Sequence, residues 1–357
     1  MPSTLQQTVQ PKSKDEEWIP NPDLLNTISS IETQESPPAS PTDAVQRHPN
    51  DAKVVIGTCS VVGDDRVHVN EDRFKVVTDL FARHAPPGVK YSGTPSRQVA
   101  FLGVYDGHGG TDVAELLRHK LHKLVARNLY PVNHHTSVSN ALAQSFLQTE
   151  ERYFRTSLAG SCCTAVLLKE RSLYCANAGD SGAVLLPYSA KPFKPRGKPI
   201  WLCERHTVYL SKNEKKRLKR AGAEIAAIPG LEDAIVCRSR RDREIHKAIY
   251  PTRCFGDADF KDLTRPISAL IVEPTGRGVG HEGDAVTLTG KGPWLLVVAC
   301  DGLWDFVSQG QVMKNIFQGN IERSPTAIAE GLVKLAQNPP ANSDDDTTVI
   351  VAKVSYD

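Results

Sequence analysis

Two distant segments of this chain share one construction, an apolar run that ends on the pair Asp-Gly. FLGVYDGHGG (101–110) contains the first pair at Asp106, and LLVVACDGLWD (295–305) contains the second at Asp301. Each apolar run predicts a buried strand, and the glycine that follows lets the backbone turn and approach a ligand closely. Each carboxylate is therefore delivered at the end of a strand and not in its middle.

Further carboxylates lie beside other apolar runs. Asp180 follows the segment YCANAG, Asp345 precedes the closing segment TTVIVAKV, and the pair Glu71-Asp72 precedes a third predicted strand. Several anionic groups at one rim repel each other unless a cation lies among them, and hard oxygen ligands of this kind suit Mg²⁺ or Mn²⁺. The pattern therefore predicts a divalent metal site.

Each of these positions, taken alone, also has an ordinary structural interpretation. A single Asp-Gly is typical of a turn that caps the next helix, and Glu71-Asp72 reads equally well as a surface acidic pair. His108 reads either as a hydrogen-bonded turn residue or as a proton donor. The recurrence of strand-Asp-Gly almost 200 residues later favours the metal interpretation.

The bulk properties exclude several classes of protein. The chain has 357 residues and a formal net charge of +2, so no global field calls for nucleic acid. No run approaches the roughly 18 apolar residues of a membrane span, and the N-terminus lacks the apolar stretch of a signal peptide. The eight cysteines show no zinc spacing and are expected to be reduced. We expect a cytoplasmic protein, with the nucleus as the alternative that KKRLKR (215–220) leaves open. A solvated helix face is the more common explanation of such a charged run.

The distribution of strands and helices predicts the fold class. Predicted strands cover 53–62, 72–79, 162–168, 172–178, 182–186, 293–300 and 347–354. Helices are predicted after the glycines at 107–110, over 137–154, and after the capping residues Ser211, Ser308 and Ser324. Strands come in blocks and helices in pairs, which indicates an α+β protein with mainly antiparallel sheets. Residues 1–50, rich in Pro, Ser, Thr and Gln, are expected to form a disordered tail, and 51–357 a single domain.

The residue two positions after Asp106 separates two kinds of phosphoryl chemistry. An enzyme that forms an aspartyl-phosphate would place a second Asp there, whereas this chain has His108. The pattern thus favours a metal-activated water over a covalent aspartate. Eight segments in order then resemble the metal-dependent protein serine/threonine phosphatases of the type 2C (PPM) family. They are NEDRF (70–74), VYDGHGG (104–110), GSCCTAVLL (160–168), ANAGDSGAVL (176–185), RLKRAGAEI (217–225), TRCFGDADFK (252–261), ACDGLWD (299–305) and DDDTTVIV (344–351).

The resemblance implies a four-layer αββα sandwich, in which two antiparallel sheets are flanked by helix pairs and the metal site lies at one end. It also implies a set of roles. Asp106 would bridge two Mn²⁺ or Mg²⁺ ions, with Glu71 and the Gly107 carbonyl on one ion and Asp301 and Asp345 on the other. Asp72 would act through hydrogen bonds to water on the metals.

The remaining roles concern an outer site and the proton donor. Asp180 and Asp305 match acidic residues of the outer site, where some members of the family bind a third ion. His108 matches the general acid. An imidazolium there would protonate the leaving serine alkoxide, and such proton transfer typically contributes about 10²–10⁴-fold to a rate.

Several positions depart from the family pattern. The phosphate-binding Arg usually lies four residues before the metal Glu, whereas Arg66 lies five before Glu71. Gly182 stands where Arg is common, and Arg205-His206 where Asp-His is common. Two further differences are Asp346 in place of a frequent Asn and the basic stretch RSRRDREIHK (238–247) in a variable region that borders the substrate groove.

The resemblance implies that the chain hydrolyses phosphoserine and phosphothreonine in proteins. Its partners would be phosphorylated protein substrates, with no nucleic acid and no membrane, and we expect a monomer. One alternative is a catalytically dead relative that serves as a regulatory binding module, although dead members typically lose metal carboxylates and this chain keeps them. Another is a phosphomonoesterase for small molecules, because metal chemistry alone does not choose the substrate.

Overall fold

The computed structural model describes most of the chain beyond the N-terminal segment. The described residues are 52–63, 69–81, 99–129, 135–227, 233–238, 245–261, 269–280 and 284–356. The expected tail at 1–50 and the candidate Arg66 lie outside these ranges, and the division at residue 50 stays a prediction.

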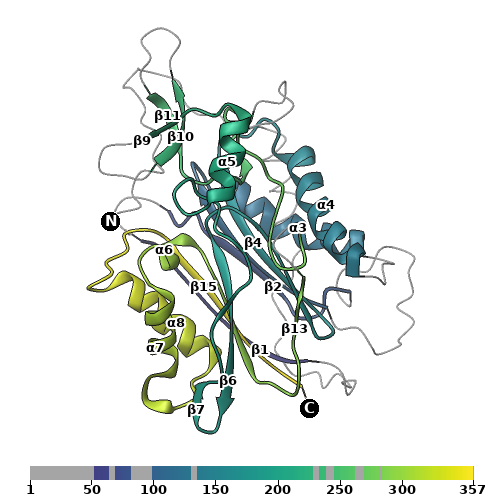
Figure 1. Ribbon diagram of the computed structural model, residues 1–357, viewed down its shortest axis with the longest axis vertical. Coiled ribbons are helices and arrows are strands. Elements are labelled where there is room, and N and C mark those ends of the chain that lie inside the picture. Colours follow the sequence, from purple (N-terminus) through teal and green to yellow (C-terminus); the bar gives the residue numbers. More distant parts are fainter. Residues whose placement is uncertain are drawn as a thin grey trace.

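Two large antiparallel sheets form the centre of the described structure (Figure 1). The first sheet is ordered β1 (Lys53–Val61), β15 (Thr347–Ser355), β14 (Trp294–Ala299), β6 (Gly182–Ala190) and β7 (Phe193–Pro195), and β8 (Ile200–Trp201) pairs with β6. The second is ordered β13 (Val286–Thr287), β5 (Ser172–Ala178), β4 (Gly160–Lys169), β3 (Val99–His108) and β2 (Arg73–Val77), and β12 (Phe255–Gly256) pairs with β4.

Helices cover the outer face of each sheet. Figure 1 shows α3 (Asp112–Leu129) and α4 (His135–Tyr153) beside the second sheet. On the other side, α6 (Asp301–Trp304), α7 (Gln309–Phe317) and α8 (Pro325–Gln337) pack against the first sheet, and the short helix η1 (Gln318–Asn320) links α7 to α8. The predicted α+β sandwich of two antiparallel sheets with flanking helices is confirmed.

The two faces of each central strand contribute to different hydrophobic layers. In β3, Leu102 and Val104 face the layer between the sheets, whereas Phe101 and Tyr105 face α3 and α4. The strand β14 divides its side chains in the same way. Because both faces are buried, these strands read as continuous apolar runs without polar alternation.

A third, three-stranded sheet adds a feature that the sequence did not predict. It is ordered β11 (Ile245–Ile249), β10 (Asp233–Arg238) and β9 (Ile225–Ala227), and it lies next to α5 (Lys212–Ala221) at the top of Figure 1. The two ends of the basic stretch 238–247 belong to β10 and β11. These strands are short, and the charged residues at their ends give no apolar run from which the hairpin could be predicted.

Candidate metal and phosphoryl-transfer site

Three aspartates from separate elements meet at one end of the two sheets. Asp106 lies near the end of β3, Asp180 in the turn between β5 and β6, and Asp301 at the start of α6 directly after β14. Side-chain oxygens of the three lie within 4.8 Å of one another. The register of β6 on β14, which pairs Gly182 with Ala299, brings Asp180 and Asp301 to the same sheet end.

These carboxylates are buried and mutually repulsive. Asp106, Asp180 and Asp301 are only 3–5 % exposed. Burial, followed by the charges of Asp301 and Asp72, raises the pKa of Asp106 well above its usual range. Burial and the neighbouring Asp180 and Asp305 do the same to the pKa of Asp301. A buried, anionic donor set made of oxygens alone fits Mg²⁺ or Mn²⁺, which prefer carboxylate ligands.

Other predicted metal ligands border this cluster. Asp72 is buried, and its Oδ2 atom has no hydrogen-bond partner among the described residues. Burial raises the pKa of Asp72 well above its usual range, and hydrogen bonds to Thr348 and Cys300 only partly oppose that rise. The charge of Asp345 acts on both Asp72 and Asp106.

A glycine and an aspartate bring Glu71 to the cluster. A Cβ at Gly107 would lie 2.5 Å from the Glu71 carbonyl oxygen, so β3 can approach this segment only with glycine at that position. The Glu71 N–H donates to Asp346 Oδ2 at 2.6 Å, and the Gly63 N–H donates to Asp346 Oδ1 at 3.1 Å. Asp346, noted in the sequence only as a departure, therefore holds the backbone of a predicted ligand.

His108 makes a buried contact that no sequence pattern indicated. Its Nε2 atom lies 2.7 Å from Asp257 Oδ2, and Asp257 also accepts a hydrogen bond from the Cys254 thiol at 3.0 Å. Burial alone lowers the pKa of His108, but the charge and hydrogen bond of Asp257 outweigh it and raise that pKa above its ordinary value. The His108 Nδ1 atom is buried and has no hydrogen-bond partner among the described residues.

The backbone leaves space for this contact. His108 pairs with Gly160 across β3 and β4, and a Cβ at Gly160 would lie 1.8 Å from Asp257 Oδ2 and 2.2 Å from His108 Nε2. Asp257 has a φ of 49°, in the left-handed region where Asp and Asn are among the better tolerated residues. The sequence signal for Asp257 was weak, because TRCFGDADFK carries two aspartates and nothing local selects the first.

The pair Arg205-His206, whose arginine departs from the family pattern, supports the turn that carries Asp180. Arg205 donates to the Asp180 backbone carbonyl and to the Asp305 carboxylate. The neighbouring His206 is buried, and its Nδ1 accepts the Gly179 N–H at 3.3 Å. Burial and the nearby Arg253 lower the pKa of His206 to about 3, so its ring stays neutral and can accept that hydrogen bond.

The structure thus brings Asp106, Asp180 and Asp301 together, with Asp72 and Asp345 close enough for their charges to act on Asp106. Glu71 and His108 border the same end of the sheets, and the charge of Glu71 acts on His108. The predicted phosphate ligand Arg66 lies outside the described residues.

No helix in the described part of the chain combines the length and the apolar character needed to cross a bilayer.

Comparison with known proteins agrees with this geometry. The family model described as Protein phosphatase 2C matches residues 74–345. "Protein phosphatase 2C homolog 3" of Schizosaccharomyces pombe is 30% identical over 259 residues, which is 70% of this chain and 53% of that protein. "Protein phosphatase 2C homolog 2" of Aspergillus flavus is 28% identical over 256 residues, 70% of this chain and 51% of that protein. The chain therefore spans about half the length of these curated relatives.

Solved structures share the fold at lower sequence identity. The crystal structure of a serine-threonine phosphatase 2C from Toxoplasma gondii superposes with a TM-score of 0.64 at 19% identity, and the match covers 89% of this chain and 100% of that one. A C. elegans sex determining protein superposes with a TM-score of 0.61 at 19% identity, covering 84% of this chain and 64% of that one. The fold, the buried aspartates and the family match over most of the sequence together identify the chain as a member of the protein phosphatase 2C family.

Proposed function

We propose that this protein is a metal-dependent phosphatase that hydrolyses phosphoserine and phosphothreonine in proteins. The observation that carries the proposal is the meeting of Asp106, Asp180 and Asp301 in one buried cluster, delivered from three distant segments of a phosphatase 2C chain. Such a cluster is electrostatically unfavourable by itself and becomes favourable around divalent cations.

The residues assigned to the metals are those with oxygen donors at this end of the sheets. We assign Asp106, Glu71 and the Gly107 carbonyl to one ion, and Asp106, Asp301 and Asp345 to a second. Asp72 would support both ions through hydrogen bonds to their bound water, and Asp180 would be available to a third ion. When bound, the cations would offset the negative charge of the phosphoryl group and activate a water molecule as the nucleophile.

His108 is assigned as the general acid, with Asp257 as its positioning residue. In the protonated ring, Nε2–H donates to Asp257 Oδ2, which leaves Nδ1–H to protonate the departing serine or threonine oxygen. The Asp257 carboxylate both orients the ring and stabilises its positive charge. This arrangement gives the leaving group a proton donor next to the acidic cluster.

The choice of a protein substrate depends on family membership and on the retained carboxylates. The Toxoplasma gondii protein of the same fold is described as a serine-threonine phosphatase 2C. The absence of nucleic-acid partners and the monomeric state stay predictions. This chain keeps the carboxylates of the family's metal-binding pattern, which favours catalysis over a role as a dead binding module.

The test is a phosphatase assay with a phosphoserine protein and with p-nitrophenyl phosphate, each with added Mn²⁺ or with chelator. We expect turnover of both substrates with Mn²⁺ and none with chelator. Asp106→Asn and Asp301→Asn should each lower kcat by more than about 10³-fold, whereas Asp284→Asn, a matched change at an exposed aspartate, should leave it unchanged.

The outcomes separate the proposal from its alternatives. Full turnover by Asp301→Asn would refute the assignment of that residue. Turnover of small esters without turnover of phosphoprotein would identify a small-molecule phosphomonoesterase. Metal binding without turnover of either substrate would identify a binding module.

A further inference from the structure

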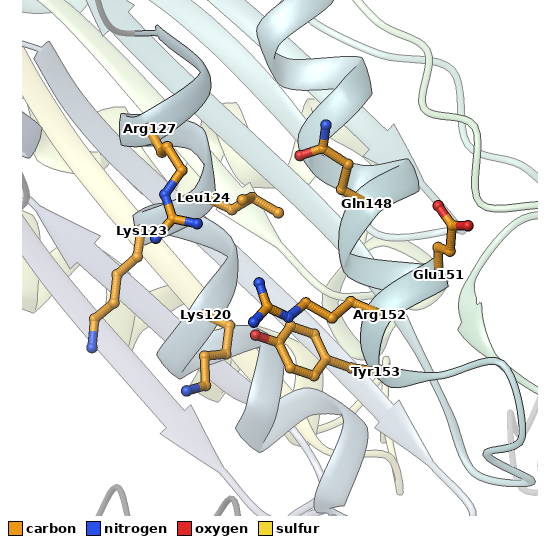
Figure 2. A pocket seen from close by; sticks show the side chains of 8 residues that line it. All are labelled: Lys120, Lys123, Leu124, Arg127, Gln148, Glu151, Arg152 and Tyr153. Carbon is orange, nitrogen blue, oxygen red and sulfur yellow. The ribbon is translucent and has the colours of Figure 1, made fainter. Parts of the chain in front are cut away.

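A groove between the two outer helices α3 and α4 is lined largely by cations. It has a volume of about 550 Å³. Figure 2 shows Lys120, Lys123 and Arg127 along α3 and Arg152 on α4, four of the residues that line the groove. The other lining residues are Leu124, Gln148, Glu151 and Tyr153. Four of these eight side chains are positively charged and one is negatively charged, so the groove carries a net charge of about +3.

These cations have no ion-pair partner within the part of the chain that the structure describes. Other surface cations of the same region are paired, since Arg73 and Arg118 both contact Glu115 and Lys261 contacts Glu150. Figure 2 shows the Glu151 carboxylate turned away from the cations on α3. The positive charge of the groove is therefore not neutralised from within.

The arrangement is repulsive for the free protein. Lys120 and Lys123 are three residues apart and Lys123 and Arg127 are four apart, so they are neighbours on the helix surface. Partial burial lowers the pKa of Lys120, and the charges of Lys123 and Arg152 lower it further. An anion in the groove would relieve this repulsion, which is the physical reason to expect one.

The groove also offers groups that suit a peptide. The Arg152 guanidinium lies 5.4 Å from the centre of the Tyr153 ring, and this stacking orients its planar donors. Leu124 and Tyr153 provide an apolar floor, and the Gln148 amide can pair with a peptide backbone. Guanidinium groups bind phosphate with two parallel hydrogen bonds, which makes a phosphorylated residue the best match.

The groove lies apart from the acidic cluster, along the helix that follows Asp106 and His108 in the chain. The first residue of α3 is Asp112, four positions after His108, and Lys120 and Arg127 follow eight and fifteen residues later. At a rise of about 1.5 Å per residue, the groove begins about 12 Å and ends about 22 Å along the helix from its start. An extended peptide covers that distance with about four to seven residues.

We propose that the α3–α4 groove binds an acidic or phosphorylated segment of the protein substrate, separate from the phosphoresidue that enters the acidic cluster. The proposal rests on the proposed phosphatase function and adds a docking site to it. Charge complementarity favours a segment that carries glutamate, aspartate or a second phosphate at least about four to seven residues from the reacting one.

The experiment compares two triple variants of equal charge change. Lys120→Glu with Lys123→Glu and Arg127→Glu alters the groove, and Lys194→Glu with Arg196→Glu and Lys198→Glu alters exposed cations at and after β7 on the other sheet. Each variant is assayed on three substrates. The first is a phosphoserine peptide with a run of glutamates six residues from the phosphoserine, the second is the same peptide with glutamines in place of those glutamates, and the third is p-nitrophenyl phosphate.

We expect the groove variant to raise KM for the acidic peptide about tenfold with kcat unchanged, and to leave the glutamine peptide and p-nitrophenyl phosphate unaffected. The variant at 194–198 should behave as the wild type on all three substrates. Equal KM values for the acidic peptide in the wild type and the groove variant would overturn the docking site. The neutral triple Lys120→Gln, Lys123→Gln and Arg127→Gln provides the same comparison if the charge reversal destabilises α3.

A binding assay keeps this outcome distinct from a failure of the proposed function. With chelator present to prevent turnover, a fluorescein-labelled acidic phosphopeptide should bind the wild type about tenfold more tightly than the groove variant, even if the protein shows no phosphatase activity. Binding to phosphatidylserine vesicles that the groove variant loses, without any change in peptide binding, would overturn the proposal and identify a membrane surface instead.

Discussion

The buried contact between His108 and Asp257 depends on the backbone as much as on the two side chains. Asp257 reaches the imidazole from a left-handed backbone position, and Gly160 leaves the space in which the two side chains meet. Neither condition is visible in a local motif, because His108 and Asp257 are 149 residues apart in the sequence.

At the residue scale, Asp257→Asn tests the positioning role directly. Asparagine keeps the size of the side chain and tolerates the left-handed backbone, so the change removes mainly the charge. We expect kcat on a phosphoserine peptide to fall about 10- to 100-fold. The fall on p-nitrophenyl phosphate should be much smaller, because p-nitrophenolate leaves without needing a proton.

The substrate comparison is the control for that prediction. An equal loss on both substrates, or a lowered melting temperature that accounts for it, would mean that Asp257 serves structure and not proton transfer. Asp257→Glu should recover part of the activity on the peptide, since it restores the carboxylate.

At the scale of elements, the pairing of β3 with β4 sets the distance between His108 and its neighbours. We predict that Gly160→Ala lowers kcat about as strongly as Asp257→Asn, because its Cβ would occupy the position of the Asp257 and His108 side-chain atoms. Steady-state kinetics and thermal unfolding measure the two effects separately. Gly197→Ala, at a glycine with open space around it, is the matched control and should change neither.

Helix α5 is joined to the segment before β12 through one buried carboxylate. The sequence predicted Ser211 as the cap of a helix, and the Ser211 side chain does accept the Glu214 N–H. The Glu214 side chain, however, contacts Arg217, Thr252 and Arg253. Burial would raise the pKa of Glu214, but the hydrogen bonds from Arg253 and Arg217 outweigh it and lower that pKa to about 2.

We therefore predict that Glu214→Gln lowers the free energy of unfolding by about 3 kcal/mol at neutral pH, because it leaves the nearly buried Arg253 without its carboxylate partner. Since the pKa is lower in the folded state, this stabilisation is complete above about pH 4.5 and disappears as the pH falls towards 2. Urea unfolding at pH 7 and pH 3 measures it. The control is Glu330→Gln, at an exposed glutamate. A free energy of unfolding for Glu214→Gln at pH 7 that equals the value of the wild type or of this control would contradict the prediction.

At the scale of the whole molecule, the acidic cluster opposes folding unless cations are present. Four buried aspartates with raised pKa values, Asp72, Asp106, Asp180 and Asp301, lie where the two sheets end together. Each ionised carboxylate adds a negative charge to a region of low dielectric constant, and solvent does not screen the repulsion between these charges. Stability and metal binding are therefore linked throughout the sandwich.

We predict that the order of stability between wild type and Asp301→Asn reverses with the metal. In chelator, the variant should melt about 2–4 °C higher than wild type, because one repulsive charge is gone. In Mn²⁺, wild type should gain stability and the variant should gain little, so wild type becomes the more stable. Thermal unfolding in both conditions measures this, and a variant that is less stable in both would show that Asp301 is not held in a repulsive cluster.

The sequence alone determined the long strands and helices of the sandwich and the existence of an acidic site, but not the short strands β9–β11. Apolar runs with adjacent turn residues predicted β1, β3, β14 and β15, and the serines at 308 and 324 predicted the starts of α7 and α8. These features are local, because backbone preference, capping and burial of an apolar run act over a few residues. The repeated strand-Asp-Gly pattern predicted metal ligands for the same reason.

Only the tertiary structure decided which groups meet. Three of the contacts described above join residues far apart in the sequence. Asp346 binds the Glu71 backbone, Asp257 contacts His108, and Glu214 contacts Arg253. The groove between α3 and α4 likewise exists only because two helices pack side by side. Strand register and helix packing set such contacts, and both result from burial summed over the whole molecule, which no short segment encodes.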